Sequence, residues 1–196
     1  MKKPIVLFGA SGKSGQAIVG RARQLGLSVR EADRRVLAHP KALDRIIKGV
    51  FAVVIVFGPR PPYTDIFCTS ATGKIIQSMK RSGVKRLLCQ TGAMIGRYPQ
   101  NRSFLFEKMS NIYRKQNPSG YMDRVKQEDI IKHTPLDWTI IKPPRLVDSD
   151  KEKVVYADEH TCVGIFSSIT RTSLSGFILK ELSHPKRIRK VVFVTN

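Results

Sequence analysis

The feature that most constrains the fold is a glycine-rich turn near the N-terminus. Gly9, Gly12 and Gly15 follow the short apolar run Ile5–Phe8 and lead into residues 16–24, where apolar side chains recur at helical spacing. A strand, a tight turn and a helix in this order present free backbone N–H groups at a helix N-terminus, where a pyrophosphate binds. The pattern therefore predicts a dinucleotide site at the first strand-to-helix junction.

The polar residues of the turn add hydrogen-bond donors for a phosphate. Ser11 and Ser14 carry hydroxyls and Lys13 carries an ammonium group, and charge-assisted hydrogen bonds are the stronger class. A glycine turn can also serve merely to pack a helix on a strand. A Walker-type phosphate loop places Gly-Lys-Ser/Thr after four intervening residues, whereas two residues separate Gly9 from Gly12. Binding of a dinucleotide is therefore favoured over hydrolysis of a nucleoside triphosphate.

The rest of the chain alternates apolar runs with amphipathic segments. Strands are expected at about residues 52–57, 86–90, 138–141 and 189–195, and helices at about residues 40–48, 65–82 and 123–133. Continuously apolar strands between such helices indicate a parallel sheet covered on both faces. The sequence predicts an α/β fold with a doubly wound parallel sheet, a Rossmann fold of three αβα layers, in one domain over residues 1–196. Residues 94–120 and 145–165, rich in polar and turn residues, are expected to be long loops at the rim.

The composition fits a chain without membrane or metal association. Hydrophobic residues make up 41% of the 196 residues, and no apolar run approaches the roughly 20 residues that span a bilayer. No signal-peptide pattern precedes the first strand. Cys68, Cys89 and Cys162 are odd in number and widely spaced, which favours reduced thiols, and the four histidines lack metal-ligand spacing. We therefore expect a cytoplasmic protein with no metal site.

The charge balance is strongly basic. The chain has 35 Lys and Arg against 15 Asp and Glu, a formal net charge of +20, which attracts polyanions. Two interpretations stay open: a solvated basic surface, or contact with nucleic acid or a ribonucleoprotein. Aromatic residues make up 8% and no RNA-reading motif is present, so any such contact is expected to be nonspecific and steeply salt-dependent. The expected assembly state is a monomer or a dimer.

Five ordered blocks carry a family resemblance. They are Phe8–Gly15, Met79–Leu88, Thr91–Ala93, Leu136–Pro144 and Ser168–Thr172. With them the chain resembles the atypical short-chain dehydrogenases/reductases, specifically the NmrA-like NAD(P)H-binding branch that includes biliverdin IXβ/flavin reductase. The resemblance covers nearly the whole chain and implies an oxidoreductase that binds a nicotinamide dinucleotide.

The resemblance assigns cofactor-binding roles to residues beyond the glycine turn. Arg34, at the end of the second strand, would bind the 2′-phosphate of the cofactor, with Arg35 assisting. Three residues after the next apolar strand would pass beneath the adenosine and pyrophosphate: Gly58, Pro59 and Arg60.

The same resemblance places a second group at the nicotinamide. Thr91 and Gly92 would lie near the ring, and Pro143 and Pro144 would line its other side. Flavin-reductase-like members have a serine where this chain has Gly92, so Thr91 is the nearest hydroxyl that would orient a substrate carbonyl. Thr91 is therefore the candidate catalytic residue, with an ordinary strand-end threonine as the alternative.

Two other departures from the family pattern matter. The second strand runs almost directly into residues 40–48, so about one strand-helix unit is missing and the sheet should have a reduced edge. The Tyr-x-x-x-Lys dyad of typical short-chain dehydrogenases is absent, because Tyr121 and Lys126 are five residues apart, which turns them to different faces of a helix. The tyrosines of the middle segment are expected at rim or packing positions: Tyr98, Tyr113 and Tyr121.

Cofactor choice depends on the residues that end the second strand. An acidic residue there binds the ribose 2′-hydroxyl of NAD, whereas an arginine accommodates a 2′-phosphate. Asp33 precedes Arg34 and Arg35, and strand alternation is expected to turn Asp33 to the opposite face. The sequence therefore predicts a preference for NADP(H) over NAD(H).

Two functions fit these features. The first is transfer of hydride from NADPH to a small electrophile of the flavin, quinone or tetrapyrrole class, in which the cofactor performs the difficult step. The second is a noncatalytic NAD(P)-binding module, either a redox sensor or a structural component of a nucleic-acid or ribonucleoprotein complex. The net charge, the missing dyad and the reduced edge favour the second.

Overall fold

The computed structural model describes residues 3–59 and 65–196. Within these residues seven strands form one sheet in the order β2-β1-β3-β4-β5-β9-β7. Neighbouring strands are parallel, except that β7 runs antiparallel to β9. The strands are β1 (Ile5–Phe8), β2 (Val29–Ala32), β3 (Ala52–Ile55), β4 (Arg86–Gln90), β5 (Asp137–Lys142), β7 (Tyr156–Asp158) and β9 (Lys190–Thr195).

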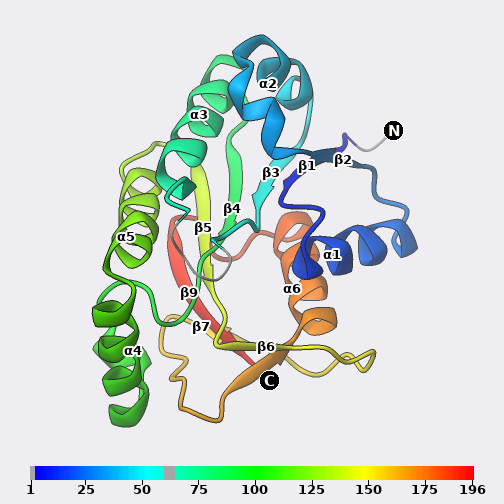
Figure 1. Cartoon of the computed structure of the whole chain (residues 1–196). Coiled ribbons are helices and arrows are strands. Elements are labelled where there is room, and N and C mark those ends of the chain that lie inside the picture. Colours follow the sequence, from blue (N-terminus) through cyan, green and yellow to red (C-terminus); the bar gives the residue numbers. More distant parts are fainter. Residues whose placement is uncertain (1–2, 60–64) are drawn as a thin grey trace.

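Helices cover both faces of this sheet (Figure 1). The helices are α1 (Lys13–Gln24), α2 (Pro40–Ile47), α3 (Cys68–Arg81), α4 (Phe104–Gln116), α5 (Pro118–Lys132) and α6 (Arg171–Ser183). One face carries α1 and α6, and the other carries α2, α3 and α5, while α4 packs against α5. The predicted doubly wound parallel sheet in three layers is confirmed.

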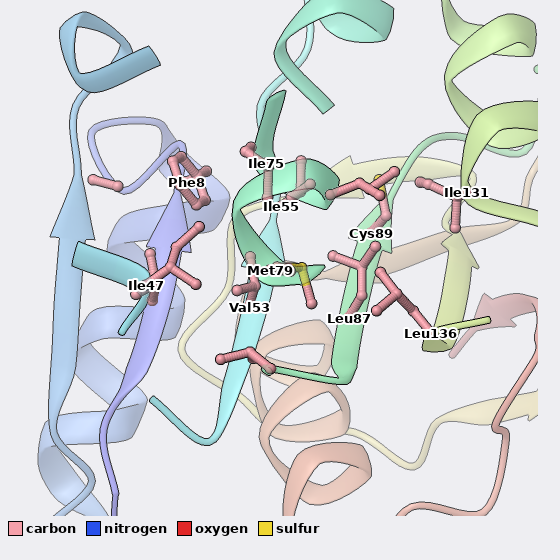
Figure 2. Close-up of a cluster of buried hydrophobic side chains, with 14 of the residues drawn as sticks. Phe8, Ile47, Val53, Ile55, Ile75, Met79, Leu87, Cys89, Ile131 and Leu136 are labelled. Carbon is pink, nitrogen blue, oxygen red and sulfur yellow. The ribbon is translucent and has the colours of Figure 1, made fainter. Parts of the chain in front are cut away.

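Alternate residues of the central strands divide between two hydrophobic cores. In β3, Val53 and Ile55 face the core under α2, α3 and α5, whereas Ala52 and Val54 face the core under α1 and α6. Figure 2 shows the first of these cores, where side chains of the sheet meet those of the covering helices. Burying one Ile or Leu side chain contributes ~1.5–3 kcal/mol. The two cores thereby fix the strand register and, with it, the position of the strand ends.

The edge beside β1 is short, as the sequence predicted. β2 is the edge strand and pairs with β1 alone among the described residues. After β2, Asp33 accepts a hydrogen bond from the backbone N–H of Arg35 (2.8 Å) and starts the 3₁₀-helix η1 (Arg34–Ala38). Pro40 then begins α2, which returns the chain to β3.

The prediction of a loop over residues 94–120 was wrong. This segment holds the 3₁₀-helix η2 (Pro99–Asn101), all of α4 and the start of α5. Phe104, at the start of α4, is 72% exposed, and the buried residues of that helix are Phe106 and Ser110. A helix is recognised in a sequence by the wide stripe of apolar side chains that it buries. Because α4 buries few side chains, it has no such stripe.

The prediction of a loop over residues 145–165 was right only in part, because two short strands interrupt the loop. β6 (Arg145–Val147) pairs with β8 (Ser168–Thr170), and β7 extends the main sheet beside β9. Each of these strands is three residues long, which is too short for an alternating pattern to be recognised. The segment therefore crosses the carboxyl ends of the strands as ordered structure.

Candidate functional site

A cleft of about 890 Å³ opens at the carboxyl ends of β1, β2 and β3. This end of an open parallel sheet is where such folds bind ligands. Four stretches supply most of the wall: residues 8–14, 31–34, 56–59 and the pair Asp65 and Phe67. Leu37, Gln90, Leu146 and Arg171 complete it. The glycine turn and the ends of the second and third strands thus line one cleft.

The three glycines of the turn differ in whether the protein itself excludes a side chain there. Gly9 has φ +93°, and a Cβ there would lie 2.8 Å from the backbone nitrogen of Phe57. A Cβ at Gly15 would lie 2.2 Å from the Gly9 oxygen, so the packing of α1 on the turn excludes it. A Cβ at Gly12 would meet nothing nearer than the Gly9 oxygen at 3.4 Å. The protein therefore tolerates a side chain at Gly12, and the empty space there belongs to the cleft.

The N-terminus of α1 faces this space and carries no competing acid. Gly12 is the N-cap residue, no side chain caps the helix, and its first turn contains no acidic residue. The uncapped N–H groups and the helix dipole make such a terminus an anion site. Ser11, Lys13 and Ser14 line the cleft beside it, where their side chains add donors.

Asp148 connects two cations at the mouth of the cleft. Its carboxylate accepts a hydrogen bond from Lys13 Nζ (2.9 Å) and another from Arg171 Nη1. The bond from Lys13 is the larger cause that holds the pKa of Asp148 below its usual value, and Arg171 acts in the same direction. The sequence analysis missed Asp148 and Arg171, although Arg171 lies in one of the five family blocks.

Arg34 lines the cleft, but its setting differs from the one predicted. The chain leaves β2 at Ala32, so Asp33 is not turned away by strand alternation, and Asp33 and Arg34 both line the cleft. The Arg34 guanidinium forms two hydrogen bonds with Asp65, of 2.5 and 3.0 Å. It also lies over the Phe67 ring, with Cζ 3.9 Å from the ring centroid. The expected orientation of Asp33 was therefore wrong.

Arg35 does not join Arg34 in the cleft. Its side chain is 90% exposed and pairs with Asp33 at 2.9 Å, and the residues that line the cleft do not include it. The turn of η1 after Asp33 points neighbouring side chains in different directions, so adjacency in sequence does not put the two arginines together.

The predicted stretch after β3 lies partly within the described residues. Gly58 and Pro59 line the cleft, whereas Arg60 lies outside the described residues. Arg124 of α5 holds the ends of β3 and β4 together by donating to the backbone oxygens of Phe57 (3.0 Å) and Gln90 (2.9 Å). No sequence signal distinguished this buried arginine from a surface one.

The residues predicted around the nicotinamide lie together at the ends of β4 and β5. The backbone N–H of Thr91 donates to Ile141 O (2.9 Å), and that of Ala93 donates to Pro143 O (2.8 Å). The four predicted residues are thereby brought close together, but none of them is among the residues that line the cleft: Thr91, Gly92, Pro143 and Pro144. Gln90, directly before Thr91, does line the cleft.

A buried ion pair lies directly behind Thr91, and the sequence analysis missed it. Lys142, at the end of β5, pairs with Glu128 of α5, and both side chains are at most 2% exposed. Lys142 Nζ also donates to Thr91 Oγ1 at 3.4 Å. The Lys142 position was visible in the sequence as a charged end to an apolar strand, but its partner could be found only once α5 was placed.

The residues present fit a dinucleotide. Gly12 leaves space in front of an uncapped helix N-terminus, which suits a pyrophosphate. Gln90 lines the wall, and its buried Oε1 has no hydrogen-bond partner among the described residues. Arg34 provides a cation at the β2 end, which suits an ester phosphate. In the same part of the chain no group of three or more His, Cys, Asp or Glu side chains is arranged to hold a metal ion.

The helices carry no membrane-spanning candidate. None of those in the described ranges combines the length and apolar character that crossing a bilayer requires.

Comparisons with known proteins agree with this geometry. A family model described as NAD(P)H-binding matches residues 9–185, while no curated protein matches the chain. Among solved structures, a putative exported protein from Burkholderia pseudomallei is 17% identical with a TM-score of 0.79, and the match covers 99% of this chain and 100% of that one.

Two other similar structures have titles that name an activity or a cofactor. A short-chain dehydrogenase/reductase from Veillonella parvula in complex with NADP is 14% identical with a TM-score of 0.76, covering 100% of this chain and 95% of that one. ChuY from Escherichia coli O157:H7, titled an anaerobillin reductase, is 14% identical with a TM-score of 0.73, covering 97% and 96%. At this identity the likeness shows the fold. Because the family model spans most of the chain, the protein belongs to the NAD(P)H-binding family.

Proposed function

We propose that this protein is an NADPH-dependent reductase that transfers hydride to a small electrophile of the flavin, quinone or tetrapyrrole class. The observation that carries the proposal is the space at Gly12, which lies before the uncapped N-terminus of α1 and opens into the cleft at the strand ends. The anaerobillin reductase and the NADP complex among the similar structures support a tetrapyrrole-like or related acceptor and a phosphorylated cofactor.

Different residues of the protein would bind different parts of the cofactor. The α1 N-terminus and the side chains of Ser11 and Ser14 would hold the pyrophosphate, and Arg34 would hold the 2′-phosphate. Thr91 would face the nicotinamide end, where its hydroxyl would orient the acceptor. NADPH, when bound, supplies the hydride, so the protein needs to orient two reactants and exclude water. The absence of a Tyr-x-x-x-Lys dyad does not conflict with such a role.

Cofactor choice tests the role of Arg34. We expect wild type to bind NADPH more tightly than NADH, and Arg34→Ala to lose about 10-fold or more of that preference, because a charge-assisted hydrogen bond is worth ~1.5–3 kcal/mol. Calorimetric dissociation constants for both cofactors measure the effect. Arg35→Ala is the matched control, since it removes the same charge outside the cleft. Equal affinities in wild type, or equal effects of the two substitutions, would contradict the assignment.

The ion pairs of Asp148 give a second binding test. Asp148→Asn should tighten NADPH binding about 2- to 5-fold, because Lys13 and Arg171 lose a carboxylate that competes with phosphate and because an exposed pair contributes at most ~1 kcal/mol. A fluorescence titration at low salt measures it. Asp150→Asn is the control, because it changes the net charge by the same amount two residues away. An equal gain in NADPH affinity in both variants would show an effect of net charge and not of the ion pairs of Asp148.

Turnover separates the proposed function from a noncatalytic module. NADPH oxidation should be followed at saturating cofactor with a flavin, with menadione and with a linear tetrapyrrole as acceptors. Oxidation that depends on the protein and saturates with one acceptor supports the reductase. Tight NADPH binding with no oxidation by any acceptor class would favour a sensor or a structural component.

A further inference from the structure

Behind Thr91, four side chains form one hydrogen-bonded chain from the interior to the surface. Lys142 Nζ donates to Thr91 Oγ1 (3.4 Å) and to Glu128 Oε1. Glu128 Oε2 accepts from the Tyr98 hydroxyl (3.1 Å), and Lys132 Nζ donates to the Tyr98 hydroxyl oxygen (2.8 Å). We propose that Lys142, Glu128, Tyr98 and Lys132 are a proton relay that resupplies the Thr91 hydroxyl during hydride transfer.

Along the hydrogen-bonded series from Lys142 to Lys132 the side chains become more exposed to solvent, as a proton relay requires. The Lys142 and Glu128 side chains are 0% and 2% exposed, whereas Lys132, at the far end, is 32% exposed. Solvent therefore reaches Lys132 and the half-buried Tyr98 but not Glu128 or Lys142. A buried ion pair adds little net stability compared with apolar residues of the same volume, so stability does not account for charges placed here. A charged group buried beside a candidate site is a recognised sign of function.

Aromatic rings enclose the inner ammonium group. Lys142 Nζ lies 4.7 Å from the Tyr98 ring centroid and 5.8 Å from that of Phe193. The two rings also contact each other edge to face, with centroids 5.5 Å apart. Protons therefore reach Lys142 through its hydrogen-bond partners and not through surrounding water.

The acidities of the two inner groups suit proton transfer. Burial lowers the pKa of Lys142 from 10.5 to about 8, although Glu128 acts to raise it, and donors with a pKa near the working pH transfer protons best. Burial and the nearby Glu128 raise the pKa of Tyr98, so its hydroxyl can give up a proton only as its oxygen takes one from Lys132, which lies within hydrogen-bond distance. Three other ionisable groups interact electrostatically with Lys142: Lys132, Arg102 and Cys89.

The proton step rests on the proposed function and balances as follows. A neutral acceptor that takes hydride from NADPH becomes an anion, and NADP⁺ is left. The Thr91 hydroxyl gives its proton to that anion and takes one from the Lys142 ammonium group. Tyr98 then gives its proton to Oε2 of the Glu128 carboxylate as the Tyr98 oxygen takes one from Lys132, and Glu128 turns its carboxyl group and passes the proton it has gained to Lys142. Lys132 regains its proton from water, so one solvent proton is consumed for each hydride.

Two acceptors with different proton demands test the relay. Menadione is neutral and needs a proton after hydride transfer, whereas methylene blue is a cation that becomes neutral by taking hydride alone. Lys142→Met should slow menadione reduction about 100-fold, within the range usual for general acid catalysis, and Tyr98→Phe about 10-fold. Methylene blue reduction should change less than about 2-fold in both. Wild type should show a solvent deuterium effect with menadione and none with methylene blue.

A matched tyrosine controls for packing. Tyr121 lies in α5, and its hydroxyl donates a hydrogen bond to the backbone oxygen of Gly96 (3.2 Å). Tyr121→Phe therefore removes a hydroxyl that lies outside the relay. If Lys142→Met fails to fold, Tyr98→Phe, which keeps the ion pair, carries the test. Equal losses with both acceptors, or equal effects of the two tyrosine variants, would overturn the relay. Wild type that binds NADPH but reduces neither acceptor would overturn the proposed function instead.

A second measurement needs no turnover. In the protein without cofactor, nitrogen-15 NMR of the Lys142 ammonium group reports its hydrogen exchange with water. If protons travel through Tyr98, the exchange should slow several-fold in Tyr98→Phe and stay unchanged in Tyr121→Phe. Slowing confined to Tyr98→Phe supports the relay whatever the acceptor, and an unchanged rate in Tyr98→Phe overturns it.

Discussion

Replacing Gly12 by aspartate is expected to weaken NADPH binding by at least about 100-fold, which corresponds to ~2.7 kcal/mol. A Cβ at this position meets no protein atom closer than 3.4 Å, so the variant should fold. The new carboxylate would occupy the space before the α1 N-terminus and repel the pyrophosphate, and a like-charge contact of this kind costs several kcal/mol. Calorimetric titration with NADPH measures the loss, and circular dichroism checks the fold.

Gly20 provides the matched control for this substitution. It lies on the exposed side of the same helix, where an added Cβ would meet nothing within 4 Å. Gly20→Asp therefore adds the same charge and the same helix-disfavouring residue without touching the cleft. A folded Gly12→Asp protein that binds NADPH as tightly as Gly20→Asp would contradict the placement of the pyrophosphate at the glycine turn.

Removing one charge of the buried Lys142–Glu128 pair is expected to cause the largest loss of stability. Lys142→Met should lower the free energy of unfolding by ~3–5 kcal/mol, because it leaves a buried carboxylate without its nearest cation. The double variant Lys142→Met with Glu128→Gln should recover most of that loss, since neither charge remains. Urea unfolding of both variants measures the difference.

A surface pair and the pH dependence control this prediction. Lys190 and Glu159 pair at 2.8 Å with both side chains about half exposed, so Lys190→Met should cost less than ~1 kcal/mol. Because the pKa of Lys142 falls from 10.5 unfolded to about 8 folded, the unfolded chain binds more protons between these values, and this group makes stability rise with pH there. Lys142→Met should lack that rise. Equal losses for the buried and surface lysines would contradict the argument.

The sequence identified the elements whose patterns are local and strong. The strands ending near Phe8, Gln90 and Thr195 were continuous apolar runs, and the glycine turn gave the site because its spacing reflects backbone needs that the structure shows at Gly9 and Gly15. Helix starts were less accurate: α3 begins at Cys68 and not near residue 65, and α5 begins at Pro118 and not near residue 123. Helix starts depend on caps, and at the α3 N-terminus the backbone N–H groups of Cys68 and Thr69 donate hydrogen bonds of 2.7 and 2.9 Å to Asp123, far along the chain.

What the sequence by itself determined is therefore the fold class, the dinucleotide family and the turn that would hold the phosphates. The turn follows from spacing within about 30 residues, which suffices to define one strand-turn-helix unit. The fold class follows from the alternation of strands and helices along the chain, and the family from a resemblance over five ordered blocks. The tertiary structure alone decided that Arg34 faces the cleft while Arg35 does not, that Asp148 bridges Lys13 and Arg171, and that Lys142 meets Glu128. These contacts join residues from different strands and helices, and their geometry exists only after the two cores have fixed how those elements pack.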